Sequence, residues 1–447
     1  MSSHIESCAQ NHARNAGAGH RDYHPSWAAV IDLVCRFKAD QRGNILIPAA
    51  ILLPVLAGAV GAAVVFSNGS ATRTNMQGSL DAAVLAGAKL PDTATASGTI
   101  AAANDVFRSN LSRFSLANAK DISASFSVNG STVSGVASGS VDNPFGGLIG
   151  PPKVAAKVNS AATKMTTPLC VLGLNGLENG SFDINGSKAK FSATCAVQAN
   201  TKSGTGMTME GQPTAIAKKF GVTGGHKGDY FSPPPADGSA KVADPYASVP
   251  FPYAEDCSSG KGKKGDNIKD DTTLSPGTYC GGIHIFGNAT KVTLQPGIYV
   301  MVDGPFWVDA SSVVTGEEVM IAFTGKGAAP QIWGDATVTL TSPTSGTYMN
   351  MQFMQDRDDL NSRGLWASIG GSAGSNAKLT YDGVAYFPTQ NWWVFGNAIV
   401  NANSPSMVIV ADKIWTQGSA SVNVTNVNTR NLKVTVPQTS LGVRLIN

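Results

Sequence analysis

The side chains best suited to covalent chemistry in this chain are its cysteines. Cys8 and Cys35 precede a long apolar segment, and four more follow it. The four that follow are Cys170, Cys195, Cys257 and Cys280. An even number beyond a membrane segment is typical of disulfides in an oxidising compartment. We favour the sequential pairing, first with second and third with fourth, among three possible pairings. A metal site is the alternative, but no CxxC motif supports it.

Carboxylates and histidines give little support for an enzyme. The pairs Asp270-Asp271 and Asp358-Asp359 are adjacent, and neighbours in a strand point to opposite faces. Only His226 and His284 lie beyond the apolar segment, which leaves little for general-base catalysis. The chain has no GxSxG, no HExxH and no glycine-rich phosphate loop. We therefore predict no catalytic residues; a polysaccharide lyase or hydrolase is the alternative.

Tryptophans suggest a binding surface instead. In TQNWWVFGNA, Trp392 and Trp393 are neighbours, so one points outward whenever the other points inward. With Tyr386 they form a candidate glycan-contact surface. This surface would be extended by Trp333, Trp366 and Trp415. The alternative interpretation is that most of these rings pack in the interior or under a cap.

The chain that would carry such a surface contains a long apolar stretch after its first 42 residues. This stretch is uncharged over 43–72 and centred on Ile45–Phe66. This core would reach about 33 Å as a helix, enough to cross the roughly 30 Å hydrocarbon layer once. The predicted membrane-anchor residues are Ile45, Leu46, Leu52, Leu53, Leu56, Val60, Val64 and Phe66.

Basic residues flank this stretch unevenly. Arg36, Lys38 and Arg42 precede it, whereas Arg73 is followed by no base until Lys89. The positive-inside bias predicts that residues 1–42 form a cytoplasmic tail and that the rest is exported. A cleaved secretory signal is the alternative, although a leader of this length is long for one.

The overall composition fits export. Charged residues are only 14% of the chain and glycines number 49, which favours an exported β-rich protein over a cytosolic enzyme. The net charge of +3 has no concentrated basic face, which argues against nucleic acid as a partner.

A small α+β module is expected after the apolar stretch. The helical spacing continues to Leu90, with Met76, Leu80 and Val84 on a face that could dock on other helices. A second helix is indicated by Ile100, Ala103, Phe107, Leu111 and Phe114. We assign 43–118 to the transmembrane helix and following helices. Residues 119–165 form a small β module, in which an Asn129-Gly130 turn joins two strands and 153–163 could add a third.

The region 168–447 shows short strand patterns and an internal repeat. TTLSPGTY (272–279) and VTLQPGIY (292–299) align at an offset of 20. This period favours a right-handed parallel β-helix of on the order of ten coils, with a β-sandwich as the alternative. A Pro/Gly-rich excursion at 231–252 would connect an early piece to the main stack. The predicted fold class is therefore mainly β, with an N-terminal transmembrane helix and a small α+β module.

The stretch RGNILIPAAILLPVLAGAVGAAVVF, followed by NMQGSLDAAVLAGA, resembles the N-terminal segment of bacterial TadE/TadG-like (Flp/Tad) pilus-assembly proteins over about residues 40–90. The matching parts are Arg42-Gly43-Asn44, the run 53–56 and the run 81–88. Two positions depart from the pattern. Val65-Phe66 replaces a common Asp, and Pro48 stands where cleavage after Gly43 would place the Glu of pilins.

The resemblance implies a structural component of a Tad-type pilus or secretion apparatus in the bacterial inner membrane. Its N-terminus would be cytoplasmic, and its β-helix would be exported to the periplasm or cell surface for assembly or adhesion. The expected partners are the membrane and other pilin-like or Tad apparatus proteins, with a glycan or host surface as a further candidate. The alternatives are a membrane-tethered carbohydrate-binding or carbohydrate-active β-helix and a filament-forming minor pilin-like subunit.

TadG-like proteins often carry a von Willebrand A domain, whose metal site uses Asp-x-Ser-x-Ser. Asp121, Ser123 and Ser125 have this spacing. The intervening Ile122, Ala124 and the following Phe126 alternate as in a strand, however, so we predict no metal site and no cofactor.

Overall fold

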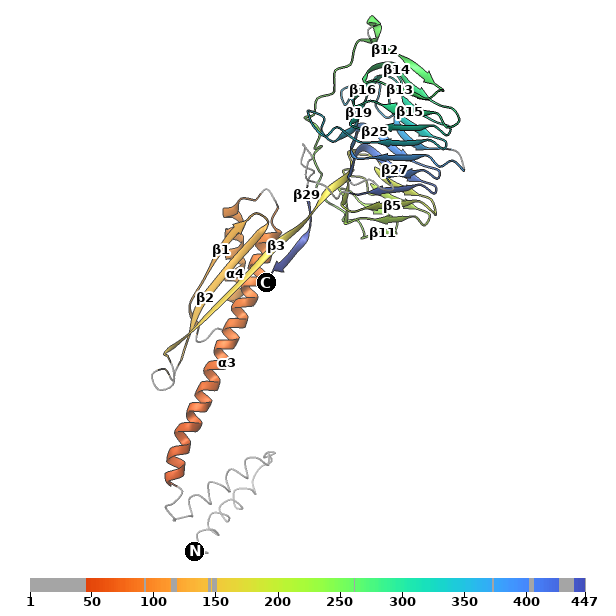
Figure 1. The fold of residues 1–447 in the computed structure, drawn as a ribbon. Coiled ribbons are helices and arrows are strands. Elements are labelled where there is room, and N and C mark those ends of the chain that lie inside the picture. The colour runs from red at the N-terminus through yellow and green to blue at the C-terminus, as the bar shows by residue number, and fades with distance from the viewer. Residues whose placement is uncertain are drawn as a thin grey trace. The chain divides into compact units, whose positions relative to one another are not determined.

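The computed structural model describes residues 46–91, 94–113, 119–143, 146, 151–260, 262–371, 374–401, 406–425 and 438–446. The tail 1–42 with Cys8 and Cys35, the anchor residue Ile45, and Phe114 lie outside the described residues. The chain is mainly β, as predicted, and divides into two compact units. Unit 1 is Met1–Thr163 with Arg444–Asn447, and unit 2 is Lys164–Val443 (Figure 1).

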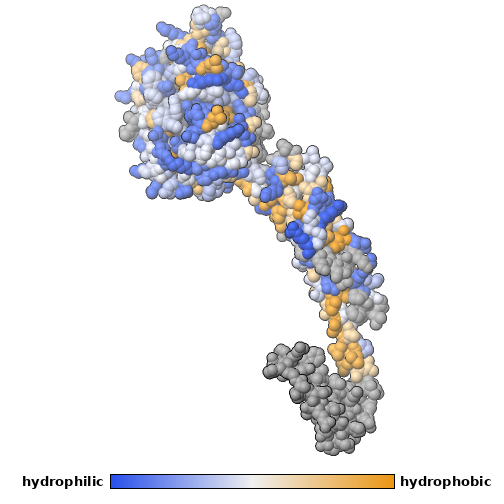
Figure 2. All heavy atoms as spheres, turned by 180° about the vertical axis from the view of Figure 1, so that it is seen from behind, coloured by the Kyte–Doolittle hydropathy of each residue, from blue (hydrophilic) through white to orange (hydrophobic). Residues whose placement is uncertain are grey.

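The long helix α3 (Leu46–Lys89) opens unit 1 and has two differently surrounded parts. Its N-terminal part exposes large apolar side chains, among them Leu53 at 66% and Phe66 at 80%. Leu52, Leu56, Val60 and Val64 are also exposed. Figure 2 shows this concentration of hydrophobic residues on the helix. In the described part of the chain, one helix, Pro48–Lys89, is long and apolar enough to cross a membrane.

The C-terminal part of α3 packs against the rest of unit 1. It contacts α4 (Ala96–Leu111), whose first turn is capped by Thr95 Oγ1 accepting from Gly98 N at 3.1 Å. It also contacts the antiparallel hairpin of β1 (Ala119–Asn129) and β2 (Thr132–Asp142), to which β3 (Lys153–Gly173) adds a third strand. The core residues are Met76, Leu80, Ala83, Ala103, Phe107, Ala137, Ala156 and Val158.

The prediction that one face of α3 docks on other helices is wrong. Met76, Leu80 and Val84 are all 0% exposed. The reason is that the chain supplies its own partner for this face. A Cβ at Gly135 of β2 would lie 2.9 Å from Leu80 Cδ1, so a residue without a side chain lets the helix approach the sheet closely. These residues hold unit 1 together and are not available to other helices.

Unit 2 is a parallel β-helix, whose strands form two hydrogen-bonded sheets. The larger one bends within each coil, so we describe its two faces as the first and second sheets and the ten-stranded sheet as the third. The first sheet holds the end of β3, β6 (Ala196–Ala199), β9 (Lys219–Val222), β16 (Gly297–Val302), β19 (Val319–Thr324) and β22 (Met351–Gln355). The second holds β4 (Phe182–Asn185), β7 (Met207–Glu210), β10 (His226–Lys227), β17 (Phe306–Val308), β20 (Pro330–Trp333) and β23 (Trp366–Gly370). Four strands run from the first sheet into the second: β12 (Lys263–Ile268), β14 (Gly277–Ile285), β25 (Gly383–Val394) and β27 (Met407–Gln417).

The third sheet has ten strands, in agreement with the expected number of coils. They are β5 (Lys190–Ala193), β8 (Thr214–Ile216), β11 (Phe231–Ser232), β13 (Thr272–Leu274), β15 (Lys291–Leu294), β18 (Val313–Gly316), β21 (Thr337–Leu340), β24 (Lys378–Tyr381), β26 (Ile399–Val400) and β28 (Ser421–Val424). The repeat found in the sequence is one such step, because Thr273 pairs with Thr293 and Leu274 with Leu294. The short helix η1 (Cys257–Ser259) precedes β12, and β29 (Gln438–Ile446) is the last strand of the chain.

The coils do not stack in sequence order. The main stack, β12 to β28, ends against the coil of β3, β4 and β5, because Ile409 pairs with Val171 and Val422 with Phe191. The coils of β6–β8 and β9–β11 follow beyond it. The chain must therefore return from β11, at one end of the stack, to β12 at the other.

This return is made by residues 233–260, which we call the strap. The strap passes the coils one after another: Ala236 N donates to Phe220 O at 2.9 Å, and Asn200 Nδ2 donates to Val242 O at 2.7 Å. At the far end, Glu255 N donates to Thr278 Oγ1 at 3.0 Å. The strap thus connects the early coils to the main stack along the length of the β-helix.

Candidate aromatic binding surface

The outer face of the second sheet carries a row of aromatic side chains. Strand alternation explains their exposure: Ile283 and Ile285 are buried, and His284 between them points outward. In the same way Phe306 and Val308 of β17 are buried on either side of the half-buried Trp307. Apolar residues at every second position therefore place the intervening rings on the surface.

Parallel register aligns these outward positions from coil to coil, about 4.8 Å apart. One position is occupied in six successive strands by His284, Trp307, Gln331, Ser368, Trp393 and Trp415. Rings from neighbouring outward positions flank this row: Phe286, Trp333, Trp366 and Phe395. We call these ten residues the aromatic stripe. It includes five of the seven tryptophans in the chain, so the tryptophans are concentrated on one surface.

At one end of the stripe a histidine is held between two rings. The His284 ring lies 3.9 Å from that of Trp307 with an interplanar angle of 11°, and 4.5 Å from that of Phe286 at 21°. Its Nε2 is 3.0 Å from Asp309 Oδ2, and both side chains are 24% exposed. Stacking and the carboxylate fix the imidazole plane, so this end is rigid.

The remaining rings also brace one another. Trp366 lies 5.4 Å from Trp393 and 5.1 Å from Trp415, and Trp393 stacks on Phe395 at 4.1 Å. Trp415 Nε1 donates to Gly180 O at 3.0 Å. Ring faces held in this way offer apolar area at little cost in side-chain entropy.

Polar groups lie in the middle of the stripe. Trp333 Nε1 donates to Ser368 Oγ at 2.9 Å, which orients the indole. The Gln331 side chain is half-buried and makes no hydrogen bond to any residue that the structure describes, so its amide can donate to and accept from a ligand. The stripe therefore combines aromatic faces with a free amide.

A carboxylate continues the register beyond Trp415. Asp183 of β4 pairs with Trp415, and burial raises the pKa of its carboxyl, against a hydrogen bond with Thr208 that lowers it. Its Oδ1 is buried without a hydrogen-bond partner within the described ranges. This end of the stripe thus holds an acid whose ionised form is disfavoured.

The glycan contacts predicted from sequence are wrong for two of three residues. Trp392 is 1% exposed and packs inside the coil, 5.7 Å from Phe387. Tyr386 is 0% exposed because the strap covers it, and its hydroxyl donates to Asp244 Oδ2 at 2.6 Å. Trp393 points outward and belongs to the stripe, as do the three additional tryptophans considered with it. His284, Phe286, Trp307 and Phe395 were missed, although their alternation with Ile and Val was a usable signal.

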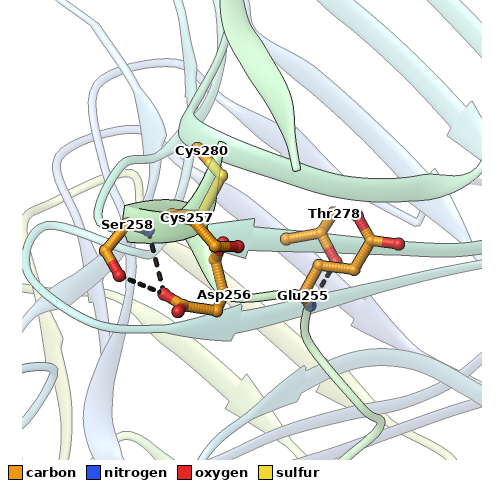
Figure 3. Close-up of a disulfide and its surroundings, with 7 residues drawn as sticks. Glu255, Asp256, Cys257, Ser258, Thr278 and Cys280 are labelled. Carbon is orange, nitrogen blue, oxygen red and sulfur yellow. Dashed lines mark hydrogen bonds between the residues drawn. A yellow bond between two sulfur atoms is a disulfide. The ribbon is translucent and has the colours of Figure 1, made fainter. Parts of the chain in front are cut away.

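The four cysteines form two disulfides in sequential order. Cys170–Cys195 links neighbouring coils of the early piece. Cys257–Cys280 fastens the end of the strap to β14 (Figure 3). Beside it Asp256 Oδ1 accepts from Ser258 N at 2.9 Å and from Ser258 Oγ at 2.7 Å. The strap is therefore held covalently where the main stack begins.

The residues with Asp-x-Ser-x-Ser spacing lie in β1. Asp121 has a φ of 55° at an irregularity in the strand, and its carboxylate is 3.4 Å from Lys153 Nζ. Over the described residues, no group of three or more His, Cys, Asp or Glu side chains is placed to hold a metal ion.

Comparison with known proteins identifies one segment. Residues 43–90 match the family model described as putative Flp pilus-assembly TadE/G-like, which confirms the resemblance predicted from sequence. The matched segment contains the whole of α3. Neither a curated protein nor a solved structure matches the chain. The match and the candidate membrane helix support a membrane component associated with a Tad pilus.

Proposed function

We propose that this protein is a non-enzymatic adhesion component of a Tad-type apparatus, anchored in the inner membrane with its N-terminus in the cytoplasm. The exported β-helix would project the aromatic stripe toward a glycan. The observation that carries this proposal is the register-aligned row of rings on unit 2 of a chain whose unit 1 has a TadE/G-like anchor.

The stripe has the chemistry expected of a glycan-binding surface. The C–H faces of sugar rings pack against aromatic faces, and sugar hydroxyls need hydrogen-bonding partners. The stripe provides rings at both ends and the free Gln331 amide between them. Because successive rings are on different coils, an extended glycan lying across the strands would meet several rings at once, and its contacts would add up.

The geometry argues against a two-carboxylate glycosidase in this surface. Asp309, beside His284, and Asp183 are separated by five steps in the second sheet, or about 24 Å. Catalytic pairs are about 5–10 Å apart. Burial also raises the pKa of the Asp412 carboxyl, but Asn175 Nδ2 lies 3.2 and 3.1 Å from its two oxygens. These contacts favour a structural role for Asp412.

Glycan binding can be tested with the full chain in nanodiscs on a glycan array. We expect binding to glycans without release of reducing sugar. The double variant Trp333→Ala/Trp393→Ala should weaken binding roughly 30-fold, at about 1 kcal/mol for each ring. Gln331→Ala should weaken it less.

Tyr253→Ala is the matched control, because this aromatic is 84% exposed and lies on the strap. Equal losses in the control and the double variant would contradict the assignment of the stripe. Turnover of the bound glycan would instead support the carbohydrate-active alternative.

A further inference from the structure

We propose that unit 1 binds an anionic phospholipid in a groove between α3 and the strands β2 and β3. This inference is independent of the adhesion proposal. The groove has a volume of about 490 Å³. On the helix side it is lined by Ala62, Phe66, Gly69 and Arg73, which recur every three or four residues and so share one helix face.

The groove exists because the helix and the sheet meet only at one end. From Thr72 onward the inward face of α3 is buried, whereas a Cβ added at Gly69 would meet nothing within 4 Å. The opposite wall is apolar, formed by Val141, Val154 and Ala156. The space between the walls can therefore hold an apolar chain without rearrangement.

The groove spans the depth at which a lipid changes from chain to headgroup. Residues 46–66 of α3 cover about 31 Å, the thickness of the hydrocarbon layer. Arg73 follows Phe66 by about 10 Å, which places its guanidinium in the headgroup region. The apolar floor thus lies at acyl-chain depth and the polar end at phosphate depth.

The charge at the polar end fits an anion. Arg73 lines the groove and forms no ion pair with any residue that the structure describes, whereas Lys157 is next to Ala156 in β3, so its side chain points to the opposite face of the sheet. Lys153, nearby on β3, is already 3.4 Å from Asp121 Oδ2. One unpaired guanidinium above an apolar floor matches a phosphate headgroup with its chain. The continuity of this floor with the lipid-exposed stretch of α3 favours a lipid over a second copy of the chain.

The test is native mass spectrometry of the delipidated full chain in detergent. Phosphatidylglycerol and phosphatidylcholine with identical acyl chains would be titrated separately, and glycerol phosphate would serve as a headgroup without chains. We expect one tightly retained phosphatidylglycerol. Arg73→Gln should weaken its binding about fivefold and leave phosphatidylcholine unchanged, whereas Lys157→Gln, on the other face of the sheet, should change neither.

Two further variants separate the groove from general effects. Gly69→Phe should fill the groove and abolish lipid retention. Gly78→Phe is the matched control, because this glycine is on the same helix, also has nothing within 4 Å of an added Cβ, and lies outside the groove. Lys89→Gln controls for loss of charge on α3. The melting temperature of each variant establishes that unit 1 remains folded.

Equal retention of the two lipids, or insensitivity to Gly69→Phe, would overturn the proposal. Displacement of phosphatidylglycerol by equimolar glycerol phosphate would also overturn it, because the site would then recognise free phosphate. A dimer that Gly69→Phe dissociates would show that a second chain occupies the groove.

Discussion

Ile409 of β27 pairs with Val171 of β3, so the end of the main stack is hydrogen-bonded to the first coil of the early piece. One β-helix is thereby built from two parts of the chain, joined within the stack. The strap is the covalent connection between its two ends, and the disulfide Cys257–Cys280 closes that connection.

Removing this disulfide should loosen the strap. For the double variant Cys257→Ser/Cys280→Ser, the sequence separation of 23 residues predicts a loss of about 3 kcal/mol in the free energy of unfolding. Hydrogen exchange should increase in the strap before it increases in β19 and β22. If hydrogen exchange increased equally in the strap and in the rest of unit 2, the disulfide would not act mainly on the strap.

The coil interior should be sensitive to loss of volume. Phe353 is 0% exposed and its ring lies 6.3 Å from Phe387 and 5.4 Å from Tyr381. We expect Phe353→Ala to cost about 3–5 kcal/mol, measured by denaturant unfolding. Leu177→Ala, at a side chain 83% exposed, should change stability by less than about 0.5 kcal/mol. A similar loss of unfolding free energy in the two variants would be inconsistent with a packed interior around Phe353.

Two leucines of α3 should respond differently to the same substitution. Leu80→Ala removes a side chain that is 0% exposed and should destabilise unit 1 by about 2–5 kcal/mol. Leu56→Ala removes one that is 57% exposed and should leave the unit folded. The measurement is hydrogen exchange of the β1 and β2 amides, with each variant of the full chain in nanodiscs. Exchange should be faster in Leu80→Ala and unchanged in Leu56→Ala. If β1 and β2 stay protected from exchange in Leu80→Ala, Leu80 is not needed for the core of unit 1. The face of Met76, Leu80 and Val84 would then be a docking surface for other helices after all.

Stability should depend on the ionisation of Asp183. Burial raises the pKa of this carboxyl above its ordinary 3.8, so folding favours the protonated form. That contribution is present at low pH and is lost as the pH rises through the folded-state pKa. Asp183→Asn should therefore raise the melting temperature at neutral pH. This increase in melting temperature should vanish at about pH 3, where the carboxyl is protonated in both the folded and the unfolded state. The exposed Asp270→Asn is the control, and a gain that does not depend on pH would contradict this account.

Much of the fold was predictable because its signals are local. The membrane helix was predicted from the uncharged run before Arg73, and the coils from the offset of 20 between Leu274 and Leu294. The disulfides were predicted from the order of the cysteines, each of which pairs with the next one along the chain. The pairing of Ile409 with Val171 has no local signal, since it depends on how the strap returns the chain.

The candidate surface was predicted only in part, for a related reason. Alternation shows that Trp392 and Trp393 face opposite ways, but their absolute direction depends on how β25 passes from the first sheet into the second. Tyr386 is covered by a segment far away in sequence, through Asp244. Helical spacing likewise found the face of Leu80 without revealing that β2 would cover it.

The most direct test of the central claim is the side of the membrane on which the β-helix lies. A site for a specific protease would be inserted after Gly346, in the exposed turn between β21 and β22. The account predicts a chain that sediments with membranes and is cleaved once protease reaches the periplasm or cell surface, while the inner membrane is intact. Cleavage only after the inner membrane is lysed, or a chain found in the soluble cytoplasmic fraction, would contradict it.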